Sequence, residues 1–414
     1  MKVLLVNQGF YPDAVSTAQH LTDFAQDLAA AGHAVTVITG SHGYDDPTVV
    51  YPRSDVLGSV KIRRVSYTAL GKKSKAARAI DFATFHLALI LELFTTSRQD
   101  IVVGLTSPPL VALPCLFFCA LKGASFVYWV MDMNPDEAIA AGWLKERSLA
   151  GRLLSALSGW SFRKSDRIVA LDRFMKMRIE RRYQVDPGRI RVLPPWAHDD
   201  ALEPIPNDQN AFRRSRGLKD KFVVMYSGNH SPCHPLDTLL GAARALKDDP
   251  AVLFYFIGGG SLVPRVTVFK KEHSLTNIVQ LPYQPKGSLS ESLSAGDLHV
   301  VVMGEPFVGI VHPCKVYGIL SVGRPFVFIG PEEGPMADLV RESRLGYPIH
   351  PNQVEALLQV IEKVRQFGGN EKDEILKRSL AFQERFSRQR VSPQLIRVLD
   401  EAYAENSTAR RNIC

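Results

Sequence analysis

Short apolar runs alternate with longer amphipathic segments along most of the chain. Val3–Val6 is an unbroken apolar run, and Ala18–Ala31 repeats apolar residues at helical spacing, which predicts a strand followed by a helix. Gly32 and His33 then end that helix as a C-cap. The pattern continues with strands at Ala34–Ile38, Val60–Val65, Ile101–Leu105, Ser125–Val130, Arg167–Leu171 and Ile190–Leu193, and with an apolar helix at Ile80–Phe94. This alternation predicts a parallel sheet with helices on both faces.

The alternation stops after Leu193 and then resumes. Leu193–Asp200 contains two adjacent prolines, and Pro204, Pro206 and the polar run Asn207–Asn210 follow, which is typical of a linker. Beyond it we predict strands at Phe222–Met225, Val252–Ile257, Ile278–Leu281, Leu298–Met303 and Pro325–Ile329. Helices are predicted at Leu236–Ala245, Leu262–Glu272, Ser288–Ser294, Lys315–Ser321, Val354–Phe367, Asp373–Phe386 and Pro393–Glu405.

The fold class is therefore α/β, with two doubly wound, Rossmann-like domains facing each other across a cleft. The predicted domains are residues 1–198 and 199–390, followed by a C-terminal helix and tail at 391–414. Packing of that helix on the N-terminal domain is one of the arrangements open to it.

Two glycine turns follow apolar strands in the second predicted domain. Tyr226-Ser-Gly-Asn229 comes after the strand Phe222–Met225, and Gly258-Gly-Gly260 comes after Val252–Ile257. Free backbone N–H groups at the carboxyl edge of a sheet bind anions, so two such turns on neighbouring strands predict a phosphate cradle for a nucleotide-type ligand. The alternative is ordinary turn chemistry, because tight turns also need the positive φ that glycine allows.

Composition narrows the partners only a little. The 414 residues carry a formal net charge of +8, which favours an anionic partner such as a nucleotide or a membrane surface. The lysines and arginines are dispersed and no nucleic-acid motif is present, so nucleic acid is not expected. The five cysteines form no CxxC pair, which argues against structural zinc or a disulfide framework and favours the cytoplasm. Pro114, Lys122 and Gly123 interrupt the apolar region Leu110–Val130, so no transmembrane helix is predicted.

Ordered motifs over residues 1–370 resemble the GT-B glycosyltransferases, particularly the retaining family 4 enzymes and their bacterial branch that builds O-antigen, capsule and exopolysaccharide. The motifs are Met1-Lys-Val-Leu-Leu-Val-Asn-Gln-Gly-Phe-Tyr-Pro12, Gly32-His-Ala-Val-Thr-Val-Ile-Thr39, Thr106-Ser-Pro-Pro109, Asp132-Met-Asn-Pro-Asp136, Ile168-Val-Ala-Leu171, Tyr226-Ser-Gly-Asn229, Leu236-Asp-Thr-Leu-Leu240 and His312-Pro-Cys-Lys-Val-Tyr-Gly-Ile-Leu-Ser-Val-Gly-Arg-Pro325. The resemblance implies transfer of a sugar from a nucleotide diphosphate donor to a hydroxyl acceptor. The short carboxylate-x-carboxylate motif that chelates a divalent metal in other transferases is not evident among these motifs, so we predict that the protein needs no metal or other cofactor.

The resemblance places the donor in the second domain. Lys315 is the expected cation for the diphosphate, with His312 beside it as a second catalytic candidate, although an isolated lysine is more commonly a solvated surface residue. The expected donor-binding residues are Ser227, Gly228, Asn229, His234, Gly258, Gly259, Gly260, Ile310, Val311 and Tyr317. His234 departs from the family, which commonly has a basic residue at this position. A neutral histidine can still donate one hydrogen bond to the donor. Ile310 and Gly318 depart further, because they stand where the family carries two glutamates.

The resemblance places the acceptor in the first domain. Asp132 is expected to orient or deprotonate the acceptor hydroxyl, and Asp136, Ser16 and Thr17 are expected to contact the acceptor. The structural alternatives are an Asx-turn for the aspartates and a helix N-cap for Ser16 or Thr17. Retention implies front-face chemistry, in which the donor phosphate accepts the proton of the incoming hydroxyl.

A basic stretch precedes the apolar helix of the first domain. Gly71–Ala79 carries four cations and leads into Ile80–Phe94, which suits adsorption to anionic lipid. A polyprenyl-linked saccharide acceptor at the inner membrane face would account for this arrangement, giving a cytoplasmic protein with peripheral membrane association. The alternative is that this stripe (Phe82, Phe85, Leu89 and Leu93) belongs to the core.

Two other functions of the same fold remain open. A UDP-sugar epimerase needs acid/base carboxylates near the sugar, and the missing glutamates weigh against it. A non-catalytic subunit that binds a nucleotide sugar or a partner transferase is favoured by Ile310 and Gly318. The presence of Lys315, Asp132 and both glycine turns weighs against that second alternative.

Overall fold

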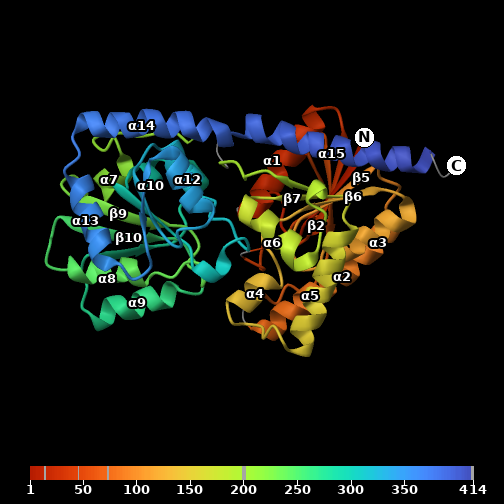
Figure 1. Cartoon of the computed structure of the whole chain (residues 1–414), viewed down its shortest axis with the longest axis horizontal. Coiled ribbons are helices and arrows are strands. Elements are labelled where there is room, and N and C mark those ends of the chain that lie inside the picture. Colours follow the sequence, from red (N-terminus) through yellow and green to blue (C-terminus); the bar gives the residue numbers. More distant parts are fainter. Residues whose placement is uncertain (14, 45, 72–73, 198–201, 412–414) are drawn as a thin grey trace. The chain divides into compact units, whose positions relative to one another are not determined.

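The computed structural model describes residues 1–13, 15–44, 46–71, 74–197 and 202–411 (Figure 1). Its Cα positions group into two compact units. Unit 1 comprises Met1–His198, Gly309–Val311 and Gln389–Cys414, and unit 2 comprises Asp199–Val308 and His312–Arg388. The predicted boundary at residue 198 lies outside the described residues and stays a prediction.

Unit 1 is built on an eight-stranded sheet in the order β3-β4-β2-β1-β5-β6-β7-β8. All neighbours pair in parallel except β3 and β4. The strands are β1 Lys2–Val6, β2 Ala34–Gly40, β3 Ser54–Leu57, β4 Val60–Val65, β5 Ile101–Gly104, β6 Ser125–Trp129, β7 Arg167–Ala170 and β8 Ile190–Val192. The central strands are apolar and buried because helices cover both faces, as expected for a parallel sheet.

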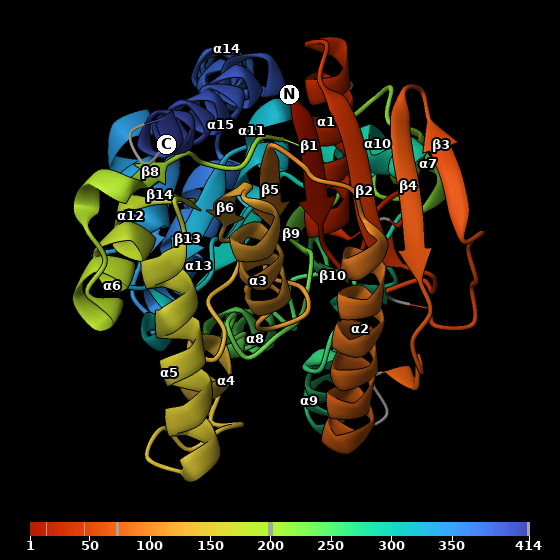
Figure 2. The same cartoon turned by 90° about the vertical axis from the view of Figure 1, so that its right-hand side faces the viewer.

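The helices of unit 1 are α1 Ser16–Ala30, α2 Lys75–Thr95, α3 Ala112–Lys122, α4 Asp136–Ala140, α5 Leu149–Lys164, α6 Arg173–Tyr183 and α15 Arg388–Arg411. Helices α1, α2, α3 and α6 pack against strands of this sheet. Figure 2 shows unit 1 with α2, α3 and α5 in front. The C-terminal helix α15 packs on this unit, where Ser125 Oγ donates to Ala402 O at 3.1 Å and Arg191 pairs with Glu401 at 2.9 Å.

Unit 2 has a six-stranded parallel sheet in the order β11-β10-β9-β12-β13-β14. Its strands are β9 Phe222–Ser227, β10 Val252–Ile257, β11 Ile278–Leu281, β12 Leu298–Val302, β13 Phe326–Ile329 and β14 Gly346–Ile349. Its helices are α7 Ala211–Ser215, α8 Asp237–Ala245, α9 Val263–Glu272, α10 Leu289–Ser294, α11 Lys315–Ser321, α12 Pro335–Ser343, α13 Val354–Arg365 and α14 Gly369–Gln383. The strand order reverses between β9 and β12, which is the position where such sheets bind ligands. The predicted α/β class with two Rossmann-like sheets is confirmed.

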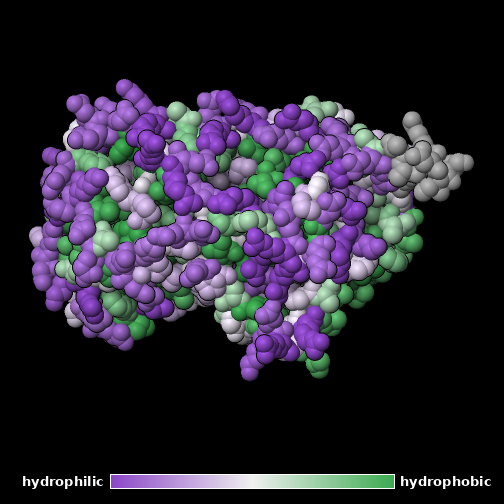
Figure 3. Space-filling view, in the orientation of Figure 1, coloured by the Kyte–Doolittle hydropathy of each residue, from purple (hydrophilic) through white to green (hydrophobic). Residues whose placement is uncertain are grey.

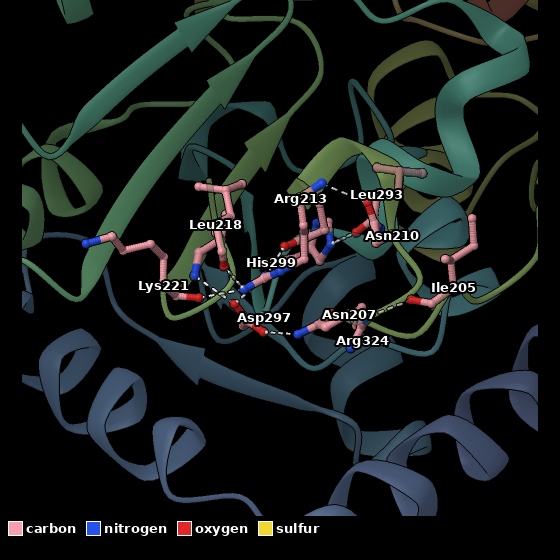
Figure 4. Close-up of polar contacts among 12 residues, drawn as sticks. Ile205, Asn207, Asn210, Arg213, Leu218, Lys221, Leu293, Asp297, His299 and Arg324 are labelled. Atoms are coloured by element: carbon pink, nitrogen blue, oxygen red, sulfur yellow. Dashed lines mark hydrogen bonds and ion pairs between the residues drawn. The ribbon is translucent and has the colours of Figure 1, made fainter. Parts of the chain in front are cut away.

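A buried network fixes the start of unit 2 to the amino ends of its strands (Figure 4). Arg213 donates to Asp297 Oδ2 at 2.9 Å and to the carbonyls of Ala295, Leu218 and Lys221 at 2.6–2.7 Å. Asn207 donates to Asp297 Oδ1 at 2.9 Å, so residues of the predicted linker belong to this network. Because Arg213 is buried, its removal leaves the Asp297 carboxylate and three carbonyls without their partner.

We predict that Arg213→Met destabilises unit 2 by about 3–5 kcal/mol, the cost of breaking a buried ion pair on one side. Hydrogen exchange of the β9 and β12 amides in urea measures this loss. Arg214→Met is the matched control, because the neighbouring Arg214 is exposed and its guanidinium donates to the backbone carbonyl of Asp208 rather than to a carboxylate. Equal exchange in the two variants would show that the network does not stabilise the unit.

Candidate functional site

The two glycine turns of unit 2 pack directly against each other at the carboxyl ends of β9 and β10. A Cβ atom on Gly258 would lie 2.1 Å from Gly228 O, and one on Gly260 would lie 2.3 Å from Asn229 Oδ1. Gly228, Gly258 and Gly260 also have φ values of +137°, +131° and +125°. Both the close approach and the backbone conformation therefore exclude other residues at these positions.

The backbone amides of these turns divide into two groups. Gly228 N donates to Ile257 O and Gly258 N donates to Leu281 O, both at 2.9 Å, so these two predicted donor-binding amides serve the sheet. Within the described part of the chain, the amides of Asn229, Gly259 and Gly260 have no recorded hydrogen bond. Ser227, the last residue of β9, is half-buried beside them. The free amides give the turns the anion-binding character of a backbone nest.

Lys315, the first residue of α11, reaches the first of these turns. A Cβ on Gly228 would lie 3.3 Å from Lys315 Nζ, and Nζ lies 3.9 Å from the centre of the Tyr226 ring. The Nζ atom is buried and makes no hydrogen bond to the described residues. The Tyr226 hydroxyl donates to Asn229 O at 2.7 Å, which ties the ring under the ammonium to the turn itself. A buried ammonium without an acceptor is costly and marks a place where an anion is accommodated.

The surroundings of Lys315 disfavour its charge. Desolvation lowers the pKa of Lys315 to about 7. Desolvation also lowers the pKa of His230 and holds that of His234 well below its usual value, and the nearby Lys315 charge acts in the same direction on both. His234 is therefore neutral, and its Nδ1–H donates to Val302 O at 2.6 Å. The N–H that the sequence analysis assigned to the donor is thus used by β12, which leaves Nε2 as an acceptor.

The remaining candidates from the Lys315 segment separate into two places. His312 and Tyr317 lie together in unit 2, with Nε2 of the histidine 2.8 Å from the tyrosine hydroxyl and the rings parallel within 10°. Ile310 and Val311 belong instead to unit 1, where Ile310 O accepts from Met133 N at 3.0 Å. Their backbone is therefore not grouped with the glycine turns of unit 2.

Gly318, the second position without a family glutamate, has apolar surroundings. A Cβ there would lie 3.3 Å from Leu293 Cδ1 and 3.7 Å from Leu202 Cδ1. The nearest atoms to a side chain at this position are therefore apolar and offer a carboxylate no hydrogen bond. Among the described residues, no three or more His, Cys, Asp and Glu side chains cluster to hold a metal ion.

Asp132 lies at the carboxyl end of β6 in unit 1. Its backbone N donates to Thr106 Oγ1 at 3.3 Å. Desolvation, with a smaller repulsion from Glu137, raises the pKa of Asp132 to about 7. A carboxyl group with a pKa near neutrality suits an acid–base or orienting role.

Polar groups that the sequence analysis missed lie at the ends of the neighbouring strands. Gln8 N donates to Ser107 O at 2.7 Å, and Ser107 N donates to Asn7 Oδ1 at 3.3 Å. These residues follow β1 and β5, between which the strand order of unit 1 reverses. The available signal was the position of each polar residue immediately after a buried apolar strand.

Asp136 has contacts that favour a structural role. Its buried carboxylate pairs with Arg178 at 2.8 Å and Arg182 at 3.0 Å, and it accepts a hydrogen bond from the Tyr183 hydroxyl. Three partners use the lone pairs that an acceptor sugar would need.

Ser16 and Thr17 begin α1, but the N-cap position belongs to Val15, which makes no side-chain cap bond. The helix-cap alternative for Ser16 and Thr17 is therefore wrong. The exposed Ser16 keeps its hydroxyl close to His20 Nδ1, at 3.4 Å.

Tyr283 is a further residue that the sequence analysis missed. It follows β11, and its ring is half-exposed. A Cβ on Gly259 would lie 3.0 Å from Tyr283 Cε2, so the ring lies against the second glycine turn. An aromatic residue two positions beyond the predicted strand Ile278–Leu281 was the signal in the sequence.

Comparisons with known proteins find similar glycosyltransferases. A family model described as Glycosyltransferase Family 4 matches residues 17–200. The probable glycosyltransferase WbjE of Pseudomonas aeruginosa is 27% identical over 64% of this chain and 66% of that protein. The putative colanic acid biosynthesis glycosyl transferase WcaI of Escherichia coli K12 is 25% identical over 88% of this chain and 92% of that protein.

The fold is also shared with solved structures. Anabaena Alr3699/HepE, in complex with UDP and glucose, superimposes with a TM-score of 0.70 at 14% identity, over 97% of this chain and 100% of that one. The fold, the family model and the two relatives all indicate a glycosyltransferase. The chain therefore has the fold of the GT-B glycosyltransferases, and it is similar to the family 4 enzymes over residues 17–200.

Proposed function

We propose that the protein transfers a sugar from a nucleotide diphosphate donor to a hydroxyl of a lipid-linked saccharide, with retention and without a metal ion. The observation that carries this proposal is the buried Lys315 ammonium against the glycine turns, which makes no hydrogen bond within the described part of the chain. Support also comes from HepE, a protein of the same fold whose solved structure contains UDP. The association of WcaI with colanic acid biosynthesis supports a surface polysaccharide as the product.

Lys315 and the free amides of Asn229, Gly259 and Gly260 supply what a departing diphosphate needs. The leaving group gains negative charge as the sugar–phosphate bond breaks, and fixed dipoles with a desolvated cation stabilise that charge. The ammonium is the charge that a divalent metal supplies in other transferases, which is why we propose metal independence. The diphosphate also restores the full charge of Lys315 by raising its pKa.

Asp132 supplies the acceptor side of the proposal. Its carboxylate is placed at the end of β6, where it can accept a hydrogen bond from the incoming hydroxyl and orient it. In front-face transfer the donor phosphate takes the hydroxyl proton, so the protein needs no nucleophile for retention. Cleavage of the sugar–phosphate bond and formation of the new glycosidic bond then occur on the same face of the sugar.

A second candidate is a subunit that binds the nucleotide sugar without transferring it. The apolar surroundings of Gly318 favour it, because one donor contact of the family has no counterpart there. Donor binding without detectable transfer to any saccharide–lipid acceptor would select this candidate.

We predict that Lys315→Met weakens donor binding by about 10- to 100-fold, the loss of one charge-assisted contact. Thermal-shift screening with UDP-, GDP-, ADP- and dTDP-sugars, with and without EDTA, identifies the donor and measures the loss. The exposed Lys271→Met on α9 is the control, and its donor shift should equal that of the unmodified protein. A shift in the unmodified protein that disappears in EDTA would contradict metal independence.

We also predict that Lys315→Met stabilises the unliganded protein at pH 7, by an amount on the order of a few kcal/mol. The pKa of Lys315 falls from 10.5 in the unfolded chain to about 7 in the folded one. Between these values the unfolded chain binds the extra proton, so the free energy of unfolding rises with pH over this window. Urea unfolding at pH 7 and pH 10 checks both signs, and a variant less stable than the unmodified protein would contradict the prediction.

Donor affinity should fall as the pH rises above about 7, by up to tenfold per pH unit, because binding requires the charged Lys315. Calorimetry in buffers of different ionisation enthalpy should show uptake of close to one proton at pH 8.5. At that pH the histidines of lowered pKa are neutral in the unliganded protein. Uptake that persists in Lys315→Met would assign the proton to a histidine instead.

Asp132→Asn should slow transfer at least tenfold while leaving donor affinity unchanged, since the carboxylate acts on the acceptor alone. In the unmodified protein kcat should rise with pH through about 7, because the ionised form of Asp132 orients the hydroxyl. The conservative amide keeps the size of the side chain, so thermal stability controls for folding. An unchanged transfer rate would remove Asp132 from the mechanism.

A further inference from the structure

An apolar surface of unit 1 remains exposed across α2, α3 and α5. On α2 the large apolar side chains that face solvent are Ile80, Leu87, Ile90, Leu91 and Phe94. At 3.6 residues per turn these positions form one stripe that runs along most of the 21-residue helix. The inward residues Phe85, Leu89 and Leu93 form a second, buried stripe on the same helix.

The stripe continues on the two neighbouring helices. Helix α3 packs against both α2 and α5 and exposes Phe117 and Leu121. On α5 the exposed apolar residues are Leu149, Leu153 and Trp160, which again share one side of the helix. Figure 3 shows hydrophobic residues gathered at the lower right edge, where Figure 1 places these helices. We call this set of residues on α2, α3 and α5 the apolar face.

The charges on these helices have one sign where they meet solvent. The exposed cations are Arg78, Lys122, Arg152, Arg163 and Lys164. The acidic residues on the three helices are Asp81, which is buried, and Glu92, which pairs with Arg63 at 2.9 Å. Lys72 and Lys73, which the sequence analysis included among the cations, lie outside the described residues.

We propose that the apolar face docks on the surface of an anionic lipid bilayer. An exposed apolar stripe with cations and no free carboxylate is the composition that binds such a surface, because burial in the acyl region and attraction to headgroups act together. Across the described residues, no helix is long and apolar enough to cross a membrane. The three helices would therefore lie on the surface of the bilayer. This docking would place unit 1 beside the lipid-linked acceptor of the proposed reaction.

Vesicle co-sedimentation of the full chain tests the proposal. We expect binding to vesicles of mixed phosphatidylcholine and phosphatidylglycerol, and at least tenfold weaker binding to phosphatidylcholine alone or at high salt. The triple variant Leu87→Gln, Leu91→Gln and Phe94→Gln should lose at least tenfold in affinity for the mixed vesicles. Val268→Gln is the control, because Val268 is equally exposed but lies on α9 of unit 2.

Tryptophan fluorescence places the contact on this face. Of the four tryptophans, Trp129 and Trp196 are buried, whereas Trp160 and Trp143 are 41% and 45% exposed. Vesicles with lipids brominated on the acyl chain should quench the Trp143→Phe protein, in which Trp160 is the exposed tryptophan. They should quench the Trp160→Phe protein less. Equal quenching of both variants would show that the apolar face does not enter the bilayer.

Other outcomes overturn the proposal in distinguishable ways. Absence of vesicle binding, or an equal loss in Val268→Gln, would remove the apolar face as the docking site. A dimer in light scattering that the triple variant dissociates, without vesicle binding, would make this face an interface between two copies of the chain. Donor-induced thermal shifts should be unchanged in the triple variant, so failure of this proposal is read separately from failure of the proposed reaction.

Discussion

The candidate site depends on one electrostatic feature, the buried ammonium of Lys315, which lies over an aromatic ring and makes no hydrogen bond to the described residues. Burial of an unpaired cation costs stability, and the fold accepts that cost at the point where its strand order reverses. The groups around Lys315 also suit an anionic ligand. Two histidines have lowered pKa values, and three backbone amides have no acceptor among the residues that the structure describes.

The glycines are the geometric counterpart of this charge. Because a Cβ on Gly258 would collide with the carbonyl of Gly228, the two turns can only pack together when both lack side chains. This packing places the turn that contains Gly259 directly against the turn that Lys315 contacts. Rigidity matters here, since dipoles that are already oriented cost no reorganisation when charge develops on the leaving group.

The sequence predicted the architecture better than the details of the site. Alternating apolar runs were sufficient for the central strands, because a strand buried on both faces has no polar positions. The edge strands β3 and β14 were missed, since β3 has polar residues and β14 contains Pro348, which only an edge tolerates. The glycine turns and the position of Lys315 were recognisable as motifs. The occupied N–H of His234, the ion pairs of Asp136 and the cap at Val15 depend on residues distant in the sequence or on backbone geometry, and no local pattern encodes them.

Helix α2 shows why an apolar segment does not reveal its own environment. The sequence offered a choice between core and membrane for this segment, and the structure resolves part of it. One side of the helix belongs to the core, as one of the two interpretations predicted, and it carries Phe85, Leu89 and Leu93. The opposite side is apolar as well, but it faces solvent. A helix in a globular protein normally pairs an apolar side with a polar one, since exposed apolar area lowers solubility without stabilising the fold. An apolar outer side that extends over three helices therefore requires an explanation outside the fold, and a bilayer is the solvent in which such a surface is stable.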